Sequence, residues 1–140
     1  MNLKITVEKE ISRDIIENVF VTALEGGSNY WYWLTDETIA RVRKYVSRKD
    51  EPSLSMAIFK AVVNHFVVVQ VHDKESLGED DEAVELLGKI DVYTMQDRLQ
   101  ALANNKSYSY ALEQELNETG DANTSDIVFQ FLVMGECIFS

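Results

Sequence analysis

Hydrophobic residues recur along this chain with two different periods, which predict short strands and amphipathic helices. Apolar and polar residues alternate over residues 3–7, a pattern typical of a half-buried strand. Apolar positions over residues 15–24 are one, three and four apart, which predicts a helix that Ser12 caps and Gly26-Gly27 ends. The nearly continuous apolar run at residues 66–71 predicts a strand buried on both faces.

Helical spacing predicts five more helices further along the chain. The first begins after Thr35, which caps it, and the second covers residues 54–64 with Ser53 as its cap. The third runs from its cap, Thr94, to about Asn104, and the fourth covers residues 108–117. The fifth covers residues 127–134, with Asn123 or Thr124 as its cap. Residues 82–92 are compatible with a helix or with an irregular strand, because Gly88 favours a turn. The tail at residues 136–140 is compatible with an edge strand. Together the elements predict a single α+β domain over residues 1–140, with a small antiparallel sheet packed against five to six helices.

The segment at residues 25–33 has an unusual composition, since it contains both tryptophans of the chain beside two glycines. One interpretation is structural: the glycines end a helix and the aromatic side chains enter the core. The other is a ligand pocket, in which backbone N–H groups bind an anion, an aromatic ring stacks on a base and an arginine (Arg41 or Arg43) binds phosphate. The candidate pocket residues are Gly26, Gly27, Asn29, Tyr30, Trp31 and Arg41.

Charge changes the picture from a generic domain to an acidic one. The 140 residues carry a formal net charge of −11, which opposes direct binding to nucleic acid. Acidic residues crowd residues 73–91 and follow Lys106 without any further basic residue, whereas residues 41–49 are basic, so we expect a dipolar molecule. The candidate partner-binding acidic surface consists of Asp73, Glu75, Glu79, Asp80, Asp81, Glu82, Glu113 and Glu115.

Catalytic and metal-binding patterns are missing from the sequence. His65 and His72 have no nucleophile beside them, Cys137 has apolar neighbours, and no phosphate-binding loop or known metal-ligand spacing occurs. We therefore expect a binding protein, not an enzyme, with no cofactor and no metal. No apolar run is long enough to cross a bilayer, and the first residues lack the pattern of a signal peptide, so we expect none. A single cysteine fits a reducing cytoplasm.

Two segments carry a resemblance to a known family. The run Val21-Thr22-Ala23-Leu24-Glu25-Gly26-Gly27-Ser28-Asn29-Tyr30-Trp31 resembles a signature of small proteins encoded by bacteriophages and prophages. The ending from Asp121 through Asp126, Gln130 and Gly135 to Phe139 is similar to that family's ending, whereas Asn104 stands where a glycine is expected.

The resemblance implies a phage setting, and hence a cytoplasmic location in an infected or lysogenic bacterium. Small acidic phage proteins of this kind are often inhibitors of host defence, as anti-CRISPR proteins are. This implies a host partner with a basic, nucleic-acid-binding surface. The alternative is a sponge, a possible homo-oligomer, that sequesters a nucleotide second messenger in the pocket described above.

Overall fold

A computed structural model describes residues 1–76 and 85–140 of the chain. These residues form an α+β domain with six α-helices and a three-stranded antiparallel sheet, as the sequence predicts. The helices are α1 (Arg13–Thr22), α2 (Asp36–Tyr45), α3 (Leu54–His65), α4 (Val92–Asn104), α5 (Ser109–Leu116) and α6 (Ala122–Met134). The strands are β1 (Tyr32–Trp33), β2 (Val69–Asp73) and β3 (Leu86–Ile90), and two short helical turns, η1 (Ala23–Gly27) and η2 (Lys74–Ser76), follow α1 and β2.

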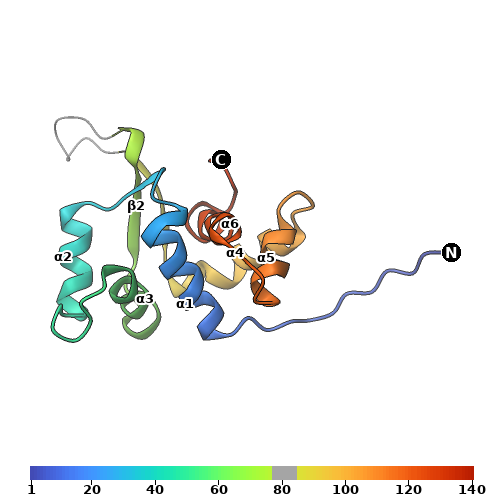
Figure 1. The fold of residues 1–140 in the computed structure, drawn as a ribbon, viewed down its shortest axis with the longest axis horizontal. Helices are drawn as coiled ribbons and strands as arrows, with labels where there is room; N and C mark the ends of the chain where they lie inside the picture. The colour runs from blue at the N-terminus through green and yellow to red at the C-terminus, as the bar shows by residue number, and fades with distance from the viewer. Residues whose placement is uncertain (77–84) are drawn as a thin grey trace.

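Helix α6 is the centre of the core. Its residues 124–133 are all buried, and it packs against α1, α4, α5, β3 and η1 (Figure 1). Phe20 of α1 contacts both Phe59 of α3 and Phe129 of α6 edge to face. Residues 124–133 leave α6 without a solvent face, so α1, α4 and α5 pack around it.

The sheet has the order β1-β2-β3, with β2 in the middle. Val69 pairs with Ile90 and Val71 pairs with Gly88, so these four residues share one face, and α6 covers it. A Cβ atom on Gly88 would overlap the carbonyl oxygen of Val133 in α6. Gly88 is therefore a strand residue that lets the helix approach. Of the alternatives that the sequence left open for this segment, the irregular strand is the one found at residues 86–90.

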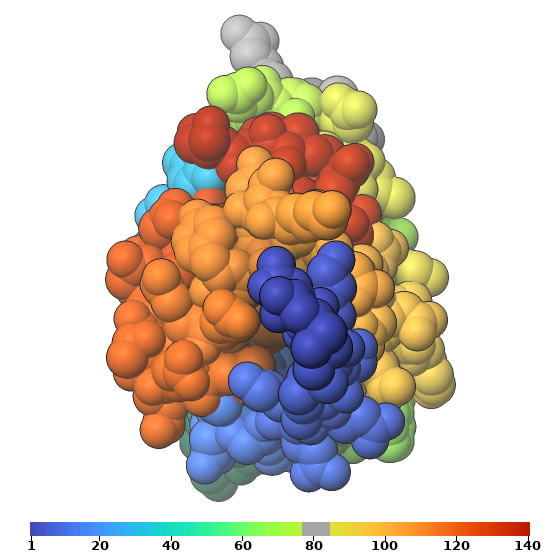
Figure 2. Space-filling view, turned by 90° about the vertical axis from the view of Figure 1, so that its right-hand side faces the viewer, coloured from blue at the N-terminus to red at the C-terminus, as the bar shows by residue number. Residues whose placement is uncertain are grey.

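Two predicted strands differ from the structure. Residues 3–7 form no strand: the first ten residues are exposed and extend away from the body, in front of α5 in Figure 2. The predicted strand at residues 66–71 begins only at Val69, because Phe66 takes a left-handed conformation (φ 57°) that ends α3. The prediction that this strand is buried on both faces is also wrong, since Gln70 is exposed between two buried valines.

Helix caps are predicted well where the capping side chain directly precedes the apolar pattern. Ser12, Thr35 and Ser53 cap α1, α2 and α3 as expected. The caps of α4 and α6 lie three residues before the expected threonines. Asp91 accepts the backbone N–H of Thr94, and Asp121 accepts that of Thr124. Each carboxylate reaches the N–H three residues on, so each threonine occupies the first turn of its helix.

Candidate functional site

The aromatic segment after α1 passes through a π-helical turn before it reaches β1. In this turn Ser28 donates its backbone N–H to the carbonyl oxygen of Ala23 at 2.8 Å. A Cβ atom on Gly27 would lie 2.7 Å from the carbonyl oxygen of Ala122, the first residue of α6. The second glycine is thus required by the close approach of α6, whereas Gly26 has open space around it.

Asp126 of α6 gathers the polar atoms of the aromatic segment. Its Oδ1 accepts hydrogen bonds from Ser28 Oγ and Trp31 Nε1, both at 2.7 Å. Its Oδ2 accepts hydrogen bonds from Tyr30 Oη at 2.6 Å and from Gln130 Nε2 at 3.1 Å. The carboxylate is 4% exposed, and four donors replace the water that it loses on burial.

Gln130, one turn further along α6, connects the same network to the C-terminal tail. Its Oε1 accepts the backbone N–H groups of Ile138 and Phe139, each at 2.9 Å, and its Nε2 donates to the carbonyl oxygen of Phe139 at 3.0 Å. This places the Phe139 ring parallel to Trp31, with 5.3 Å between ring centroids. Within the described residues the tail is not a strand, because the Gln130 side chain occupies the hydrogen-bonding groups that an edge strand needs.

Two tyrosines of the segment are perturbed by their surroundings. Burial and the hydrogen bond to Asp126 raise the pKa of Tyr30 far above its ordinary value. Burial and the nearby charge of Glu25 raise the pKa of Tyr32, whose hydroxyl donates to the carbonyl oxygen of Leu24. Both hydroxyls therefore stay protonated and serve as structural donors at neutral pH.

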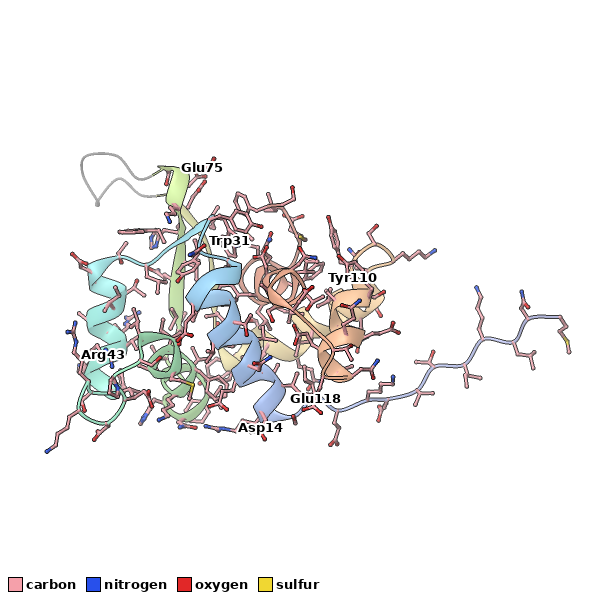
Figure 3. All side chains as sticks on the ribbon, viewed as in Figure 1. Asp14, Trp31, Arg43, Glu75, Tyr110 and Glu118 are labelled. Atoms are coloured by element: carbon pink, nitrogen blue, oxygen red, sulfur yellow. The ribbon has the colours of Figure 1, made fainter. Side chains whose placement is uncertain are left out.

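The structure does not assemble the predicted nucleotide pocket. Trp31 is 1% exposed and lies inside the molecule (Figure 3), so the prediction that its ring stacks on a ligand is wrong. Tyr30 is half-exposed, but its hydroxyl is bound to Asp126. Gly26 and Asn29 are exposed at the surface, and Arg41 lies on the exposed side of α2. Among the described residues no hydrogen bond or ion pair joins Arg41 to the segment.

A hollow of about 300 Å³ does lie beside the segment, on the side of Tyr32. Its walls include Leu24, Glu25, Tyr32, Leu34, Ser55 and Ile58. The Glu25 carboxylate accepts a hydrogen bond from Ser55 Oγ at 2.8 Å, and no lining residue is basic. A nucleotide phosphate would meet a negative charge there, so this hollow does not suit the anionic ligand that the sequence suggested.

Apart from Glu115, the predicted acidic surface divides into three groups. Asp73 ends β2 and Glu75 lies in η2, and Asp73 Oδ1 accepts the backbone N–H of Glu75 at 2.9 Å. Glu113 is exposed on α5. The other predicted members, Glu79, Asp80, Asp81 and Glu82, lie outside the described residues.

Glu115 is not on this surface, and its prediction as a partner contact is wrong. The residue is 3% exposed, and its Oε1 accepts hydrogen bonds from Thr124 Oγ1 at 2.9 Å and Ser125 Oγ at 2.7 Å. Both donors belong to the first turn of α6, where the helix dipole favours a carboxylate. Glu115 therefore joins α5 to α6.

Two acidic side chains outside the predicted acidic surface, Asp14 and Glu118, lie near Glu115. Asp14, Glu118 and the buried Glu115 line a second hollow, of about 260 Å³, between α1 and the end of α5. Figure 3 shows Asp14 and Glu118 far from Glu75, and Arg43 on α2 at the opposite side of the body. The basic residues of α2 are thus separated from this acidic hollow, which agrees with the expected dipolar distribution.

Asp126 and Gln130 are the polar residues that sequence reasoning missed. They stand four positions apart in an apolar run, so they occupy the same face of one helix. That spacing was a signal for a buried polar cluster opposite an aromatic segment rich in N–H and O–H donors.

Comparison of the chain with protein-family models, curated proteins and solved structures finds no match. The resemblance to phage-encoded proteins stays a prediction. Among the helices in residues 1–76 and 85–140, none is both long and apolar enough to cross a membrane. Residues in the same ranges contain no cluster of three or more histidine, cysteine or acidic side chains that could hold a metal ion.

Proposed function

We propose that this protein binds another protein through its acidic surface, and that the partner is a host defence nuclease with a basic nucleic-acid channel. The phage setting of this proposal comes from the resemblance of residues 21–31 and 121–139 to phage-encoded proteins. The protein acts in the bacterial cytoplasm by occupying the channel with carboxylates, and it performs no catalysis of its own.

One observation carries the proposal: few acidic side chains in residues 1–76 and 85–140 take part in an ion pair. Four of the 24 acidic residues fall in residues 77–84, and of the remaining twenty only Glu51 and Asp91 lie within ion-pair distance of a lysine. Most of the others are exposed, among them Asp14, Glu113 and Glu118 around α5. Carboxylates without a neighbouring cation produce a negative electrostatic potential around the molecule. This potential attracts a basic partner and repels nucleic acid.

The test compares charge reversals at the two acidic ends of the body. One variant carries Glu75→Lys and Glu85→Lys beside the β2–β3 connection. The other carries Glu113→Lys on α5 and Glu118→Lys just after it. Asp50→Lys with Asp97→Lys is the matched control, because it changes the net charge equally at exposed positions elsewhere. Each protein is expressed in a bacterial strain whose CRISPR nuclease restricts a phage, and plaques are counted.

We expect the wild-type protein and the control to restore plaques, and at least one reversal at the acidic ends to abolish the effect. With purified nuclease, the affinity should fall about tenfold or more as NaCl rises from 0.1 to 0.5 M. Full protection by both acidic-end variants, or an affinity independent of salt, would contradict the proposal.

A further inference from the structure

The first ten residues form an arm that the rest of the chain does not use. All ten are exposed, and Figure 1 shows them extending from the start of α1 away from the body. Leu3, Ile5 and Val7 are 80%, 85% and 66% exposed. Aliphatic side chains this exposed gain nothing from the hydrophobic effect in the isolated molecule.

The sequence of the arm is nevertheless that of a strand. Leu3, Ile5 and Val7 alternate with Lys4, Thr6 and Glu8, so an extended backbone carries one apolar and one polar face. β-Branched residues at three of these six positions favour this conformation. The arm therefore has the pattern of a half-buried strand but no partner strand among the described residues.

We propose that the arm pairs with the arm of a second copy of this chain, in an antiparallel ribbon centred on Thr6. Pairing that keeps all apolar side chains on one face requires residue numbers of equal parity to lie opposite each other. With Thr6 opposite Thr6, Lys4 of each copy lies opposite Glu8 of the other, and Ile5 lies opposite Val7. Leu3 lies opposite Lys9, so the match covers residues 4–8, where two opposite-charge pairs and two apolar pairs face each other. This match argues for a copy of this chain as the partner.

The register also sets the positions of the two bodies. In this register Asn2 lies opposite Glu10, so the two points of attachment are eight residues apart, roughly 27 Å along the ribbon. The two bodies therefore lie at opposite ends of the ribbon, and each arm ends beside the start of the other copy's body. The arm leaves the body on the side of α5 (Figure 2), where Tyr110 is 41% exposed.

A charge exchange within the arm tests the register. Lys4→Glu places like charges opposite each other twice, and Glu8→Lys does the same, so each should weaken the dimer about tenfold. The double variant Lys4→Glu/Glu8→Lys restores both opposite-charge pairs and should dimerise as well as wild type. Lys106→Glu is the matched control, because it changes net charge as Lys4→Glu does but lies on the body. The measurement is the dimer dissociation constant of the full chain from sedimentation equilibrium.

Cross-linking gives a second measurement that is independent of affinity. In a Cys137→Ser background, Thr6→Cys should form a disulfide between two copies under mild oxidation, because the two residues face each other across the ribbon. Lys4→Cys should cross-link at least tenfold more slowly, because its counterpart lies several residues away.

Three results would overturn the proposal. The first is a wild-type protein that is monomeric at all concentrations, and the second is a double variant as weak as either single variant. The third is equal cross-linking of the two cysteine variants. Because dimerisation is measured on the protein alone, these outcomes do not depend on whether the proposed inhibition of a nuclease is correct.

Discussion

At the scale of single residues, Asp126 holds the aromatic segment in place through hydrogen bonds. A buried carboxylate is costly unless donors surround it, and here Ser28, Tyr30, Trp31 and Gln130 all donate to it. Three of these donors belong to the aromatic segment and the fourth belongs to α6. One side chain therefore joins two segments that lie far apart in the chain.

Replacing Asp126 by asparagine tests the importance of this charge. The amide keeps one acceptor oxygen but turns the other into an N–H group, which faces the Tyr30 hydroxyl and the Gln130 amide. We expect a loss of about 3 kcal/mol in the free energy of unfolding, measured by urea denaturation. Asp97→Asn, at an exposed position on α4, is the control and should change stability by less than about 0.5 kcal/mol. An equal effect of the two substitutions would show that the network is not stabilising.

Tyr30 makes the folding stability of the protein depend on pH in the alkaline range. Its pKa is raised in the folded protein above the ordinary value of 10.0, so the folded state holds this proton more tightly than the unfolded state does. The contribution is complete below about pH 10 and is lost as pH rises above it. In thermal melts between pH 8 and 11, Tyr30→Phe should reduce the loss of stability. Tyr93→Phe, at a residue that is 73% exposed, should not. Parallel pH profiles for wild type and Tyr30→Phe would contradict this assignment.

The sequence left two interpretations of the aromatic segment open, and the structural one holds for Trp31. Aromatic residues and glycines are needed equally by a core and by a pocket, so residue types could not separate the two. The deciding partner, Asp126, lies 95 residues after Trp31. Such a contact has no local sequence pattern. Glu115 shows the same limit in reverse, since an acidic residue on a short helix is normally exposed.

At the scale of elements, local signals predicted the helices well and the strands poorly. Helix periodicity and capping are properties of neighbouring residues, which is why all six helices were found. Strands depend on a partner: residues 3–7 have a strand pattern without one, and β3 forms around Gly88 because α6 and β2 provide its contacts. The end of α3 and the start of β2 were not predicted correctly, because a phenylalanine, not a glycine, takes the left-handed conformation at residue 66.

Substitution by alanine should have different effects on stability at Gly88, in the contact between β3 and α6, and at Gly26, which lies outside it. Gly88→Ala places a methyl group against the Val133 backbone, which cannot move without shifting α6, and should cost about 2 kcal/mol or more. Gly26→Ala meets no atom within 4 Å and should leave stability unchanged or slightly higher. Chemical denaturation of the two variants side by side provides the measurement. A Gly88→Ala protein as stable as Gly26→Ala would mean that the helix does not approach the strand so closely.

At the scale of the whole molecule, charge opposes folding. The chain has a formal net charge of −11, and residues 1–76 and 85–140 contain only two ion pairs, so carboxylates on the body repel one another. The same property that suits a basic partner therefore costs stability, in line with the proposed function.

Screening this repulsion should stabilise the protein. We expect the melting temperature to rise as NaCl increases from about 0.01 to 0.3 M, because the Debye length shrinks from roughly 30 Å to less than 10 Å. Calorimetry in NaCl and in the same ionic strength of KCl separates screening from specific ion binding, since both salts should act alike. A melting temperature that falls with added salt would indicate that attractive pairs dominate.

Helix α6 has a consequence for how the protein opens. Ten consecutive residues of this helix are buried, and it contacts most of the other helices, so no local fluctuation can expose it. Its amide hydrogens can exchange with solvent only through unfolding of the entire domain. Helix α2, which has α3 as its main helical contact, can detach at a lower free energy. Amide exchange would then separate a slow centre built on α6 from a faster outer layer that carries the basic residues.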